Sequence, residues 1–148
     1  MVQVEISEII HAPKERVYAI NANFSNWPKI YPWVKSVRLI SEQGNERILE
    51  AVVTNKGKEQ VVHLTQSLSP NRIEETQRRK RATAIKINYA YETVPEGTRL
   101  LITASLEPRA NTILYRSATF LLRRRLVNML IRYVRSSLEL EKKAAEAK

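Results

Sequence analysis

The chain has 148 residues, of which 43% are hydrophobic and 27% charged, with a formal net charge of +10 and no cysteine. This length predicts a single domain, residues 1–148, large enough to bury a hydrophobic core. The lack of cysteine excludes disulfides, thiolate metal sites and a cysteine nucleophile. No apolar run reaches the roughly 18 residues that a membrane span requires, and residues 2–10 lack the basic flank of a signal peptide. We therefore expect a cytoplasmic protein.

Positive charge is concentrated in two segments. Residues 113–135 contain six arginines and no acid, and residues 78–86 contain five basic residues and no acid. Such segments attract the phosphates of nucleic acids or of anionic membranes. The alternative is that they form an ordinary solvated surface.

The first third of the chain predicts a strand followed by two short helices. Residues 2–10 alternate between apolar and polar side chains, as in a half-buried strand. Pro13 suits the start of a helix, and Glu15 would lie in its first turn, where the helix dipole favours an acid. Two prolines within residues 24–33 limit the second helix to a short segment. The bulky apolar side chains there would close one end of a core or line a ligand entrance.

The remainder predicts six strands and a long helix. The strands are expected at residues 34–40, 47–54, 60–68, 72–79, 81–93 and 98–106. Turns of two to four residues between them indicate antiparallel neighbours. Residues 111–148 contain neither proline nor glycine, and apolar residues recur every three or four positions, which predicts a helix whose polar end after Leu138 frays. The chain is thus α+β, a curved antiparallel sheet wrapped around its last helix.

Two neighbouring strands are not cleanly apolar on either face. In residues 60–68 one face carries Val61, His63 and Thr65, and in residues 72–79 both faces carry polar side chains. Polar groups on the inner face of the sheet would suit a cavity that orients a ligand by hydrogen bonds. The alternative is that both strands are solvated near the rim of the sheet.

Several motifs resemble a known family. They are Ser7, Ile10, Ala12, Pro13, Val17, Tyr18, Trp27, Pro28, Val34 and Val37 near the start, and Tyr91, Pro95, Glu96, Gly97, Thr98, Arg99 and Leu100 before the last helix. Together they resemble the START-like, birch-pollen-allergen-like (SRPBCC) superfamily, and within it the polyketide cyclase/dehydrase and lipid-transport family. Residues 31–36, Tyr-Pro-Trp-Val-Lys-Ser, are similar to a segment of its coenzyme-Q-binding branch, with Val34 in place of a cysteine.

The resemblance implies a helix-grip fold, in which a curved seven-stranded antiparallel sheet and the C-terminal helix enclose an apolar cavity. Two short helices after the first strand would close one end. The residues expected to line this cavity are Trp33, Val61, His63, Thr65, Glu75, Gln77, Ile87, Tyr89, Tyr91, Ile102, Leu122, Leu126, Met129 and Tyr133. Polyketide aromatases of the family carry a cavity arginine where this chain has Thr65 or Gln66, so the resemblance carries over no catalytic residue.

Two residues are nevertheless candidates for catalysis. His63, if it points inward near Glu75 or Gln77, could act as a general base, and Tyr89 could orient a carbonyl group. A hydrogen-bonded ligand contact or a rim position would explain the same histidine, and a structural role would explain the tyrosine. The chain shows no metal-ligand spacing and no phosphate-binding glycine loop. We expect neither a metal nor a cofactor.

The sequence thus leads to two hypotheses. The first is binding or transport of an isoprenoid quinone, a lipid or a polyketide-like molecule, without catalysis. The arginines at 78, 79, 81, 123, 124 and 125 would then contact an anionic membrane peripherally. The second is a polyketide cyclase, aromatase or dehydratase that uses His63, Tyr89 and Glu75. A nucleic-acid partner is not expected, because the aromatic side chains are predicted to face inward.

Overall fold

The computed structural model describes residues 2–79, 84–107 and 123–147. Its strands are β1 (Val2–Ile10), β2 (Val34–Gln43), β3 (Glu46–Asn55), β4 (Lys58–Ser69), β5 (Arg72–Arg79), β6 (Ala84–Val94) and β7 (Gly97–Glu107). Its helices are α1 (Lys14–Ala22), the 3-10 turn η1 (Phe24–Asn26), α2 (Trp27–Ile30) and α4 (Arg123–Glu146). The seven strands form one antiparallel sheet in the order β1-β7-β6-β5-β4-β3-β2, which confirms the α+β prediction.

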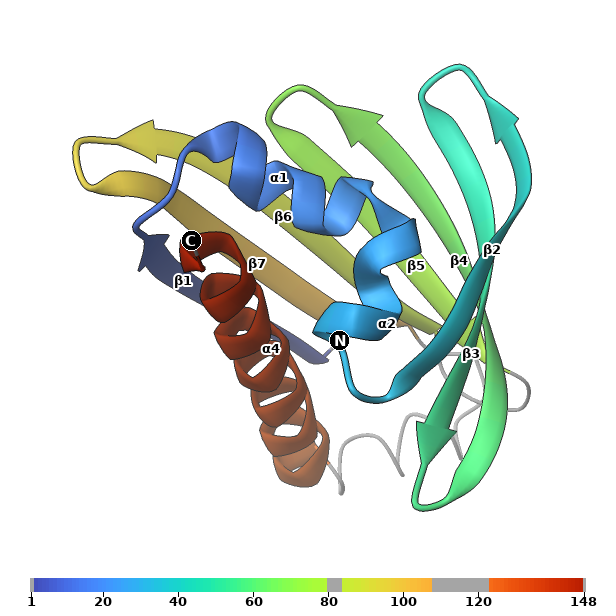
Figure 1. The fold of residues 1–148 in the computed structure, drawn as a ribbon. Helices are drawn as coiled ribbons and strands as arrows, with labels where there is room; N and C mark the ends of the chain where they lie inside the picture. The colour runs from blue at the N-terminus through green and yellow to red at the C-terminus, as the bar shows by residue number, and fades with distance from the viewer. Residues whose placement is uncertain (1, 80–83, 108–122, 148) are drawn as a thin grey trace.

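The sheet curls around α4, and α1 and α2 close one end of the concave side (Figure 1). Helix α4 packs on β1 and β7 and also contacts α1 and α2. The C-terminal end of α4 lies beside α1 (Figure 1).

The register of β3 and β4 decides which side chains face inward. Leu49 pairs with Leu64 and Ala51 pairs with Val62, and all four are buried. The apolar side chains of the two strands therefore share one face, as the period of two requires. The opposite face of β4, which includes His63, points to solvent.

The apolar interior has two parts. One joins β1, β6 and β7 to α1 and α4 through residues such as Ile102 and Val134. The other joins α2 to the start of β2 and to β3 and β4, through residues such as Trp27, Leu49 and Leu64. The polar side chains described below connect these two parts.

Helix α4 differs from the sequence prediction in two respects. The prediction of a frayed end after Leu138 was wrong, because the helix continues to Glu146 with Glu141 and Ala145 buried. Met129 was expected inside but is 48% exposed. Residues 111–122 of the predicted helix, including Leu122, lie outside the described residues. No helix among the described residues is long and apolar enough to span a membrane.

Candidate functional site

A cavity lies between the concave face of the sheet and helices α2 and α4. Its volume is about 50 Å³. The residues that line it are Asn21, Trp27, Tyr31, Trp33, Val34, Ala51, Val53, Val62, Leu64, Glu75, Gln77, Arg79, Tyr89, Tyr133 and Ser137. A water molecule needs about 10–15 Å³ of such space, so the cavity has room for a few waters. A ligand with ten or more heavy atoms can enter only if side chains in the wall move apart.

The two walls of the cavity differ in character. Strands β2, β3 and β4 provide an apolar wall that includes Val53, Val62 and Leu64. Strand β5 provides a polar wall, because Glu75 and Gln77 are buried residues on its inner face and Arg79 lies on the same face. The cavity therefore combines a hydrophobic surface with a small number of oriented polar groups, as small-molecule sites usually do.

Hydrogen bonds fix the polar wall. Both oxygens of the Glu75 carboxyl accept hydrogen bonds from amides, Oε1 from Gln66 Nε2 at 2.6 Å and Oε2 from Gln77 Nε2 at 2.7 Å. Gln77 Nε2 also donates to the Tyr133 hydroxyl at 3.1 Å. Gln66 in turn accepts a 2.8 Å hydrogen bond from Arg47 Nε. These hydrogen bonds connect side chains of β3, β4 and β5 with Tyr133 of α4.

Burial changes the titration of these groups. Burial raises the pKa of the Glu75 carboxyl, and this effect is opposed by the hydrogen bonds from Gln77 and Gln66 and by the charge of Arg47. Burial, reinforced by the charge of Glu75, raises the pKa of Tyr133 to about 12 and that of Tyr89 well above its usual value. Both phenols therefore remain protonated hydrogen-bond donors at neutral pH.

Aromatic side chains form the end of the cavity near α2. The Trp33 ring lies 5.5 Å from that of Tyr31 and 6.3 Å from that of Tyr133, measured between ring centroids. Trp27 donates through Nε1 to the backbone carbonyl of Ile20 at 2.9 Å, which fixes α2 against α1. The two tryptophans of the chain thus both lie at this cavity.

A second buried carboxyl, that of Glu141, lies beside the cavity on α4. Its Oε1 accepts a hydrogen bond from the Tyr31 hydroxyl at 2.6 Å and one from Asn21 Nδ2 at 3.4 Å. Its Oε2 is buried and has no hydrogen-bond partner among the described residues. Burial raises the pKa of Glu141 to about 7, and the hydrogen bonds from Tyr31 and Asn21 oppose this effect.

Five of the predicted cavity residues line this cavity: Trp33, Glu75, Gln77, Tyr89 and Tyr133. Ile87, Tyr91 and Ile102 are buried in the other part of the interior, and Leu126 packs against that part. The Tyr91 hydroxyl accepts a hydrogen bond from Asn21 Nδ2 at 3.2 Å. It therefore helps to hold Asn21, which also donates to Glu141.

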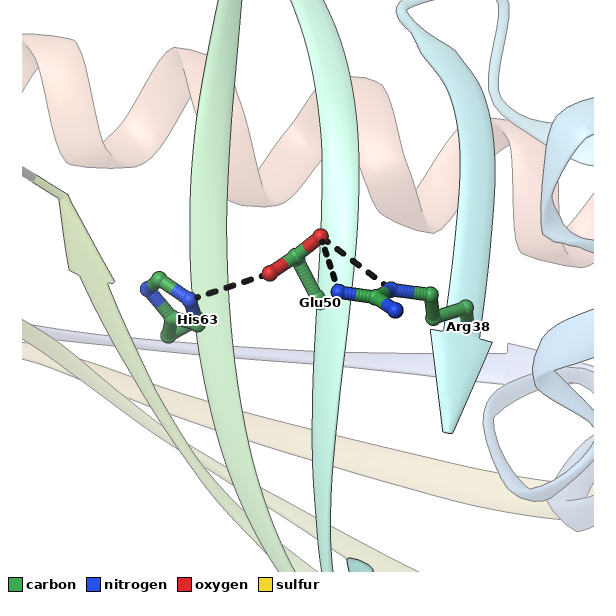
Figure 2. A network of polar contacts seen from close by, with 3 residues as sticks. All are labelled: Arg38, Glu50 and His63. Carbon is green, nitrogen blue, oxygen red and sulfur yellow. Dashed lines mark hydrogen bonds and ion pairs between the residues drawn. The ribbon is translucent and has the colours of Figure 1, made fainter. Parts of the chain in front are cut away.

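The prediction that Val61, His63 and Thr65 point into the cavity was wrong. All three are exposed on the outer face of β4, because Val62, Leu64 and Gln66 occupy the inner face. His63 Nε2 lies 3.4 Å from Glu50 Oε2, and the other oxygen of Glu50 accepts two hydrogen bonds from Arg38, at 3.1 and 3.2 Å (Figure 2). This surface cluster is remote from Glu75 and Gln77, so His63 cannot serve as a base inside the cavity.

Three inward-facing polar residues were not predicted from the sequence: Asn21, Arg47 and Glu141. Gln66 was named only as the alternative to Thr65 at the position of the family's cavity arginine. Helical periodicity could have indicated Glu141, because it lies three residues after Leu138 and seven after Val134, both of which are buried. Strand alternation could likewise have indicated Gln66, two positions after Leu64. No cluster of metal-ligating side chains is found within the described ranges.

Solved structures share this fold at low sequence identity. The Zhui aromatase/cyclase from Streptomyces sp. R1128 is 18% identical, with a TM-score of 0.78 and coverage of 97% of this chain and 93% of that chain. The protein TTHA0849 from Thermus thermophilus is 19% identical, with a TM-score of 0.75 and coverage of 97% and 96%. A START superfamily protein from Mycobacterium smegmatis is 15% identical, with a TM-score of 0.68 and coverage of 93% and 94%. These similarities confirm the helix-grip fold.

No curated protein matches the chain in sequence. The family model described as polyketide cyclase / dehydrase and lipid transport matches residues 10–135. This match spans the chain from the end of β1 into α4 and includes every residue that lines the cavity except Ser137. The chain belongs to the polyketide cyclase/dehydrase and lipid transport family.

Proposed function

We propose that the protein binds a hydrophobic small molecule, such as an isoprenoid quinone, a lipid or a polyketide-like compound, in the cavity between the sheet and α4. The observation that carries this proposal is the contrast between the two walls. Val53, Val62 and Leu64 offer an apolar surface, while Gln77 and Tyr133 offer polar atoms on the opposite side. A largely apolar molecule with one oxygen-bearing end matches this division.

Binding requires the cavity to expand from its volume of about 50 Å³. The wall most suited to move is the aromatic pair Trp33 and Tyr133, because their contact joins the start of β2 to α4 without a hydrogen bond between them. Separating the two rings costs the contact energy of this aromatic pair, roughly 0.5–1.5 kcal/mol. A movement of Trp33 also disturbs its contact with Tyr31, and a movement of Tyr133 disturbs its hydrogen bond from Gln77. An apolar ligand replaces that contact with its own.

Tryptophan fluorescence tests the proposal, because Trp27 and Trp33 are the chain's two tryptophans and both line the cavity. Titration with menadione, a quinone without an isoprenoid tail, should quench their emission saturably. Ala51→Phe places a ring in the cavity and should abolish the saturable component, whereas Val52→Phe, on the opposite face of β3, should leave it intact. Linear, non-saturating quenching in the unmodified protein would contradict the proposal.

A second candidate is a polyketide cyclase or dehydratase activity. The observation in its favour is the Glu75 carboxyl, which lines the cavity beside Gln77 and has its pKa raised by burial. A carboxyl whose pKa is raised by burial can exchange a proton with a carbonyl compound, and the hydroxyl of Tyr89 or Tyr133 can donate to the carbonyl oxygen. In this candidate mechanism Glu75 is the general acid or base, the role that the sequence-based hypothesis gave to His63.

Turnover of a poly-β-keto thioester tests the enzymatic candidate. Glu75→Gln should lower kcat by at least about 100-fold if the carboxyl transfers the proton, whereas His63→Ala should leave kcat unchanged. Equal turnover by the unmodified protein and Glu75→Gln would exclude Glu75 as the catalytic acid or base.

For a carrier, the exposed basic residues would supply a membrane contact. Arg78, Arg123, Arg124 and Arg125 are exposed. Arg79 was also expected in this contact but lies in the cavity wall, and Arg81 lies outside the described residues. Each basic residue near an anionic bilayer contributes on the order of 1 kcal/mol. Co-sedimentation with vesicles containing phosphatidylserine should weaken about tenfold or more when all three of residues 123–125 are changed to glutamine. Unchanged co-sedimentation would rule out this surface as the contact.

A further inference from the structure

The carboxyl of Glu141 has one oxygen atom that no described residue satisfies. Glu141 lies in the C-terminal half of α4 and is 1% exposed. Its Oε1 accepts the hydrogen bonds from Tyr31 and Asn21, whereas its Oε2 is buried and has no hydrogen-bond partner among the described residues. Buried polar atoms normally find a partner, and a buried charge without one is costly. The packing of the helices seen here therefore disfavours the ionised form of this carboxyl.

The groups that face Glu141 from the neighbouring elements do not offset this cost. Burial and the charge of Glu75 on β5 raise the pKa of Glu141 to about 7, and the hydrogen bonds from Tyr31 and Asn21 only partly oppose them. The phenols near the two carboxyls are neutral, because burial and the charges of Glu75 and Glu141 raise the pKa of each. They are those of Tyr31, Tyr89, Tyr91 and Tyr133.

The cations beside this part of α4 are engaged elsewhere. Arg16 of α1 donates to the backbone carbonyl of Ala145 at 3.4 Å. Lys142 of α4 pairs with Glu8 of β1 at 3.1 Å. Ionisation of Glu141 in the packed protein therefore adds a negative charge that these cations do not balance.

The hydrogen bond from Tyr31 connects this carboxyl to the aromatic wall of the cavity. The ring of Tyr31 lies 5.5 Å from that of Trp33, and the ring of Trp33 lies 6.3 Å from that of Tyr133. The contact between Trp33 and Tyr133 is the one that separates when the cavity expands. A movement of Tyr31 away from Glu141 therefore also disturbs the wall through which a ligand enters.

We propose that Glu141 is a pH-dependent latch on the cavity. The neutral carboxyl holds α4 against α1 and the end of α2, and the cavity keeps its closed volume. The ionised carboxyl favours an open arrangement, in which α4 and Tyr31 separate far enough for water to reach Oε2. The latch regulates the binding function proposed above, on which its role in uptake rests: the hydrophobic molecule enters readily at neutral pH and slowly at acid pH.

The pH range of the latch follows from the environment of the carboxyl in the two arrangements. The pKa of Glu141 is about 7 when the latch is closed, and it returns toward roughly 4.3 when water reaches the carboxyl. Between these values opening releases a proton, so the open fraction rises by up to about tenfold for each pH unit. Above about pH 7 the carboxyl is ionised in both arrangements, and the open fraction stays constant.

Hydrogen exchange tests the latch without a ligand. The amides of Tyr31 and Val34 donate to the carbonyls of Trp27 and Tyr31, and the amide of Thr54 donates to that of Trp33. Their protection factors, corrected for the intrinsic pH dependence of exchange, should fall about tenfold or more between about pH 5 and 7. Protection that does not change with pH would overturn the latch. Exchange no faster than that of the amides of β6 and β7 would also overturn it, because only global unfolding would then expose this segment.

Stopped-flow fluorescence tests the consequence for binding. The association rate constant of menadione, followed through the two tryptophans, should rise about tenfold or more between about pH 5 and 7 and then level off. Menadione does not ionise in this range, so the protein carries the dependence. Glu141→Gln should bind slowly at every pH, because its side chain stays neutral. The matched control Glu139→Gln, at an exposed position of the same helix, should follow the unmodified protein.

The outcomes separate the latch from the binding function. Protection that falls with pH, together with no saturable binding of menadione, supports the latch and contradicts the binding function. Saturable binding at a rate that does not depend on pH contradicts the latch and leaves the binding function intact. Glu141→Leu, which also cannot ionise, serves as a second variant if Glu141→Gln does not fold. A pH dependence that persists in either variant would show that another group titrates, and would overturn the assignment to Glu141.

Discussion

The Tyr31 hydroxyl donates a 2.6 Å hydrogen bond to Glu141 Oε1, and this bond joins the end of α2 to the C-terminal half of α4. Asn21 of α1 contacts the same pair, through a 3.4 Å hydrogen bond to Glu141 and a 3.3 Å hydrogen bond from Tyr31. Glu141 is only 1% exposed. The helix that closes the cavity is therefore fixed at one end by a buried carboxyl rather than by apolar contacts alone.

This carboxyl should make stability depend on pH. The pKa of Glu141 is raised to about 7 in the folded protein, against roughly 4.3 in an unfolded chain. Between these values the folded state binds more protons than the unfolded state, so the free energy of unfolding falls as pH rises. The contribution is fully present below about pH 4.3 and is lost by about pH 7, a change of roughly 3–4 kcal/mol.

Urea denaturation of Glu141→Gln from pH 4 to 8 isolates this contribution. The glutamine does not titrate and can still accept the hydrogen bond from Tyr31. The variant should gain stability relative to the unmodified protein as pH rises and reach its full advantage above pH 7. Glu139→Gln, at an exposed position on the same helix, should follow the unmodified protein. Parallel curves for all three proteins would show that Glu141 ionises normally.

Arg47 should be essential for joining α1 to the sheet. Its Nη2 donates to the carbonyl oxygens of Ala22 at 2.7 Å and Asn21 at 3.3 Å, and its Nε donates to Gln66. Arg47→Met keeps the aliphatic stem but leaves buried acceptors without donors, so it should lower the free energy of unfolding by roughly 3 kcal/mol.

The matched control for Arg47 is Arg38→Met. Arg38 is an exposed residue that pairs only with Glu50 among the described residues, and its loss should cost less than about 1 kcal/mol. Chemical denaturation of both variants measures the difference. Similar losses for Arg38 and Arg47 would mean that the buried hydrogen bonds add nothing beyond surface electrostatics.

Gly97 should not tolerate a side chain. Its φ is +144°, and a Cβ there would lie 2.3 Å from the carbonyl oxygen of Ile10, in the β1 strand that pairs with β7. Gly97→Ala should therefore cost about 3 kcal/mol or more, because backbone must move. Gly44→Ala, where φ is +61° and nothing lies within 4 Å, should cost only about 1 kcal/mol. Thermal unfolding of the two variants compares them, and an equal cost would contradict the close approach.

Removing the histidine on β4 should change little. His63 and Glu50 form an exposed pair at 3.4 Å, and such pairs contribute less than about 1 kcal/mol. His63→Ala should therefore retain its thermal stability and its affinity for menadione. A loss of binding of tenfold or more would mean that β4 presents its other face to the ligand.

The sequence was a good guide to the elements and a poor guide to some of their faces. Alternating strands and short turns predicted all seven strands, because a meander of short hairpins leaves little freedom in pairing. The orientation of β4 was assigned by alignment and was wrong. Val61 and Val62 are both apolar, so the local pattern does not decide which of them faces inward. The buried partners Leu49 and Ala51 on β3 decide it.

The polar interior was only partly predictable. Glu75 and Gln77 were expected in the cavity because neither face of their strand is cleanly apolar, which suits a cavity wall with polar groups. Glu141 was overlooked because it lies in a segment rich in lysine and glutamate, which resembles a solvated helix end. Its burial depends on contacts with Asn21 and Tyr31, which are more than 100 residues away in the sequence. Such contacts leave no signal in the local composition of a single sequence.

Native mass spectrometry of the protein isolated gently from the cells that produce it tests the central claim, that the cavity holds a hydrophobic small molecule. The expected result is a discrete added mass that organic extraction releases as a largely apolar compound with one oxygen-bearing end. The Ala51→Phe variant, isolated in the same way, should lack this mass. Detection of the bare protein alone in both preparations would contradict the claim.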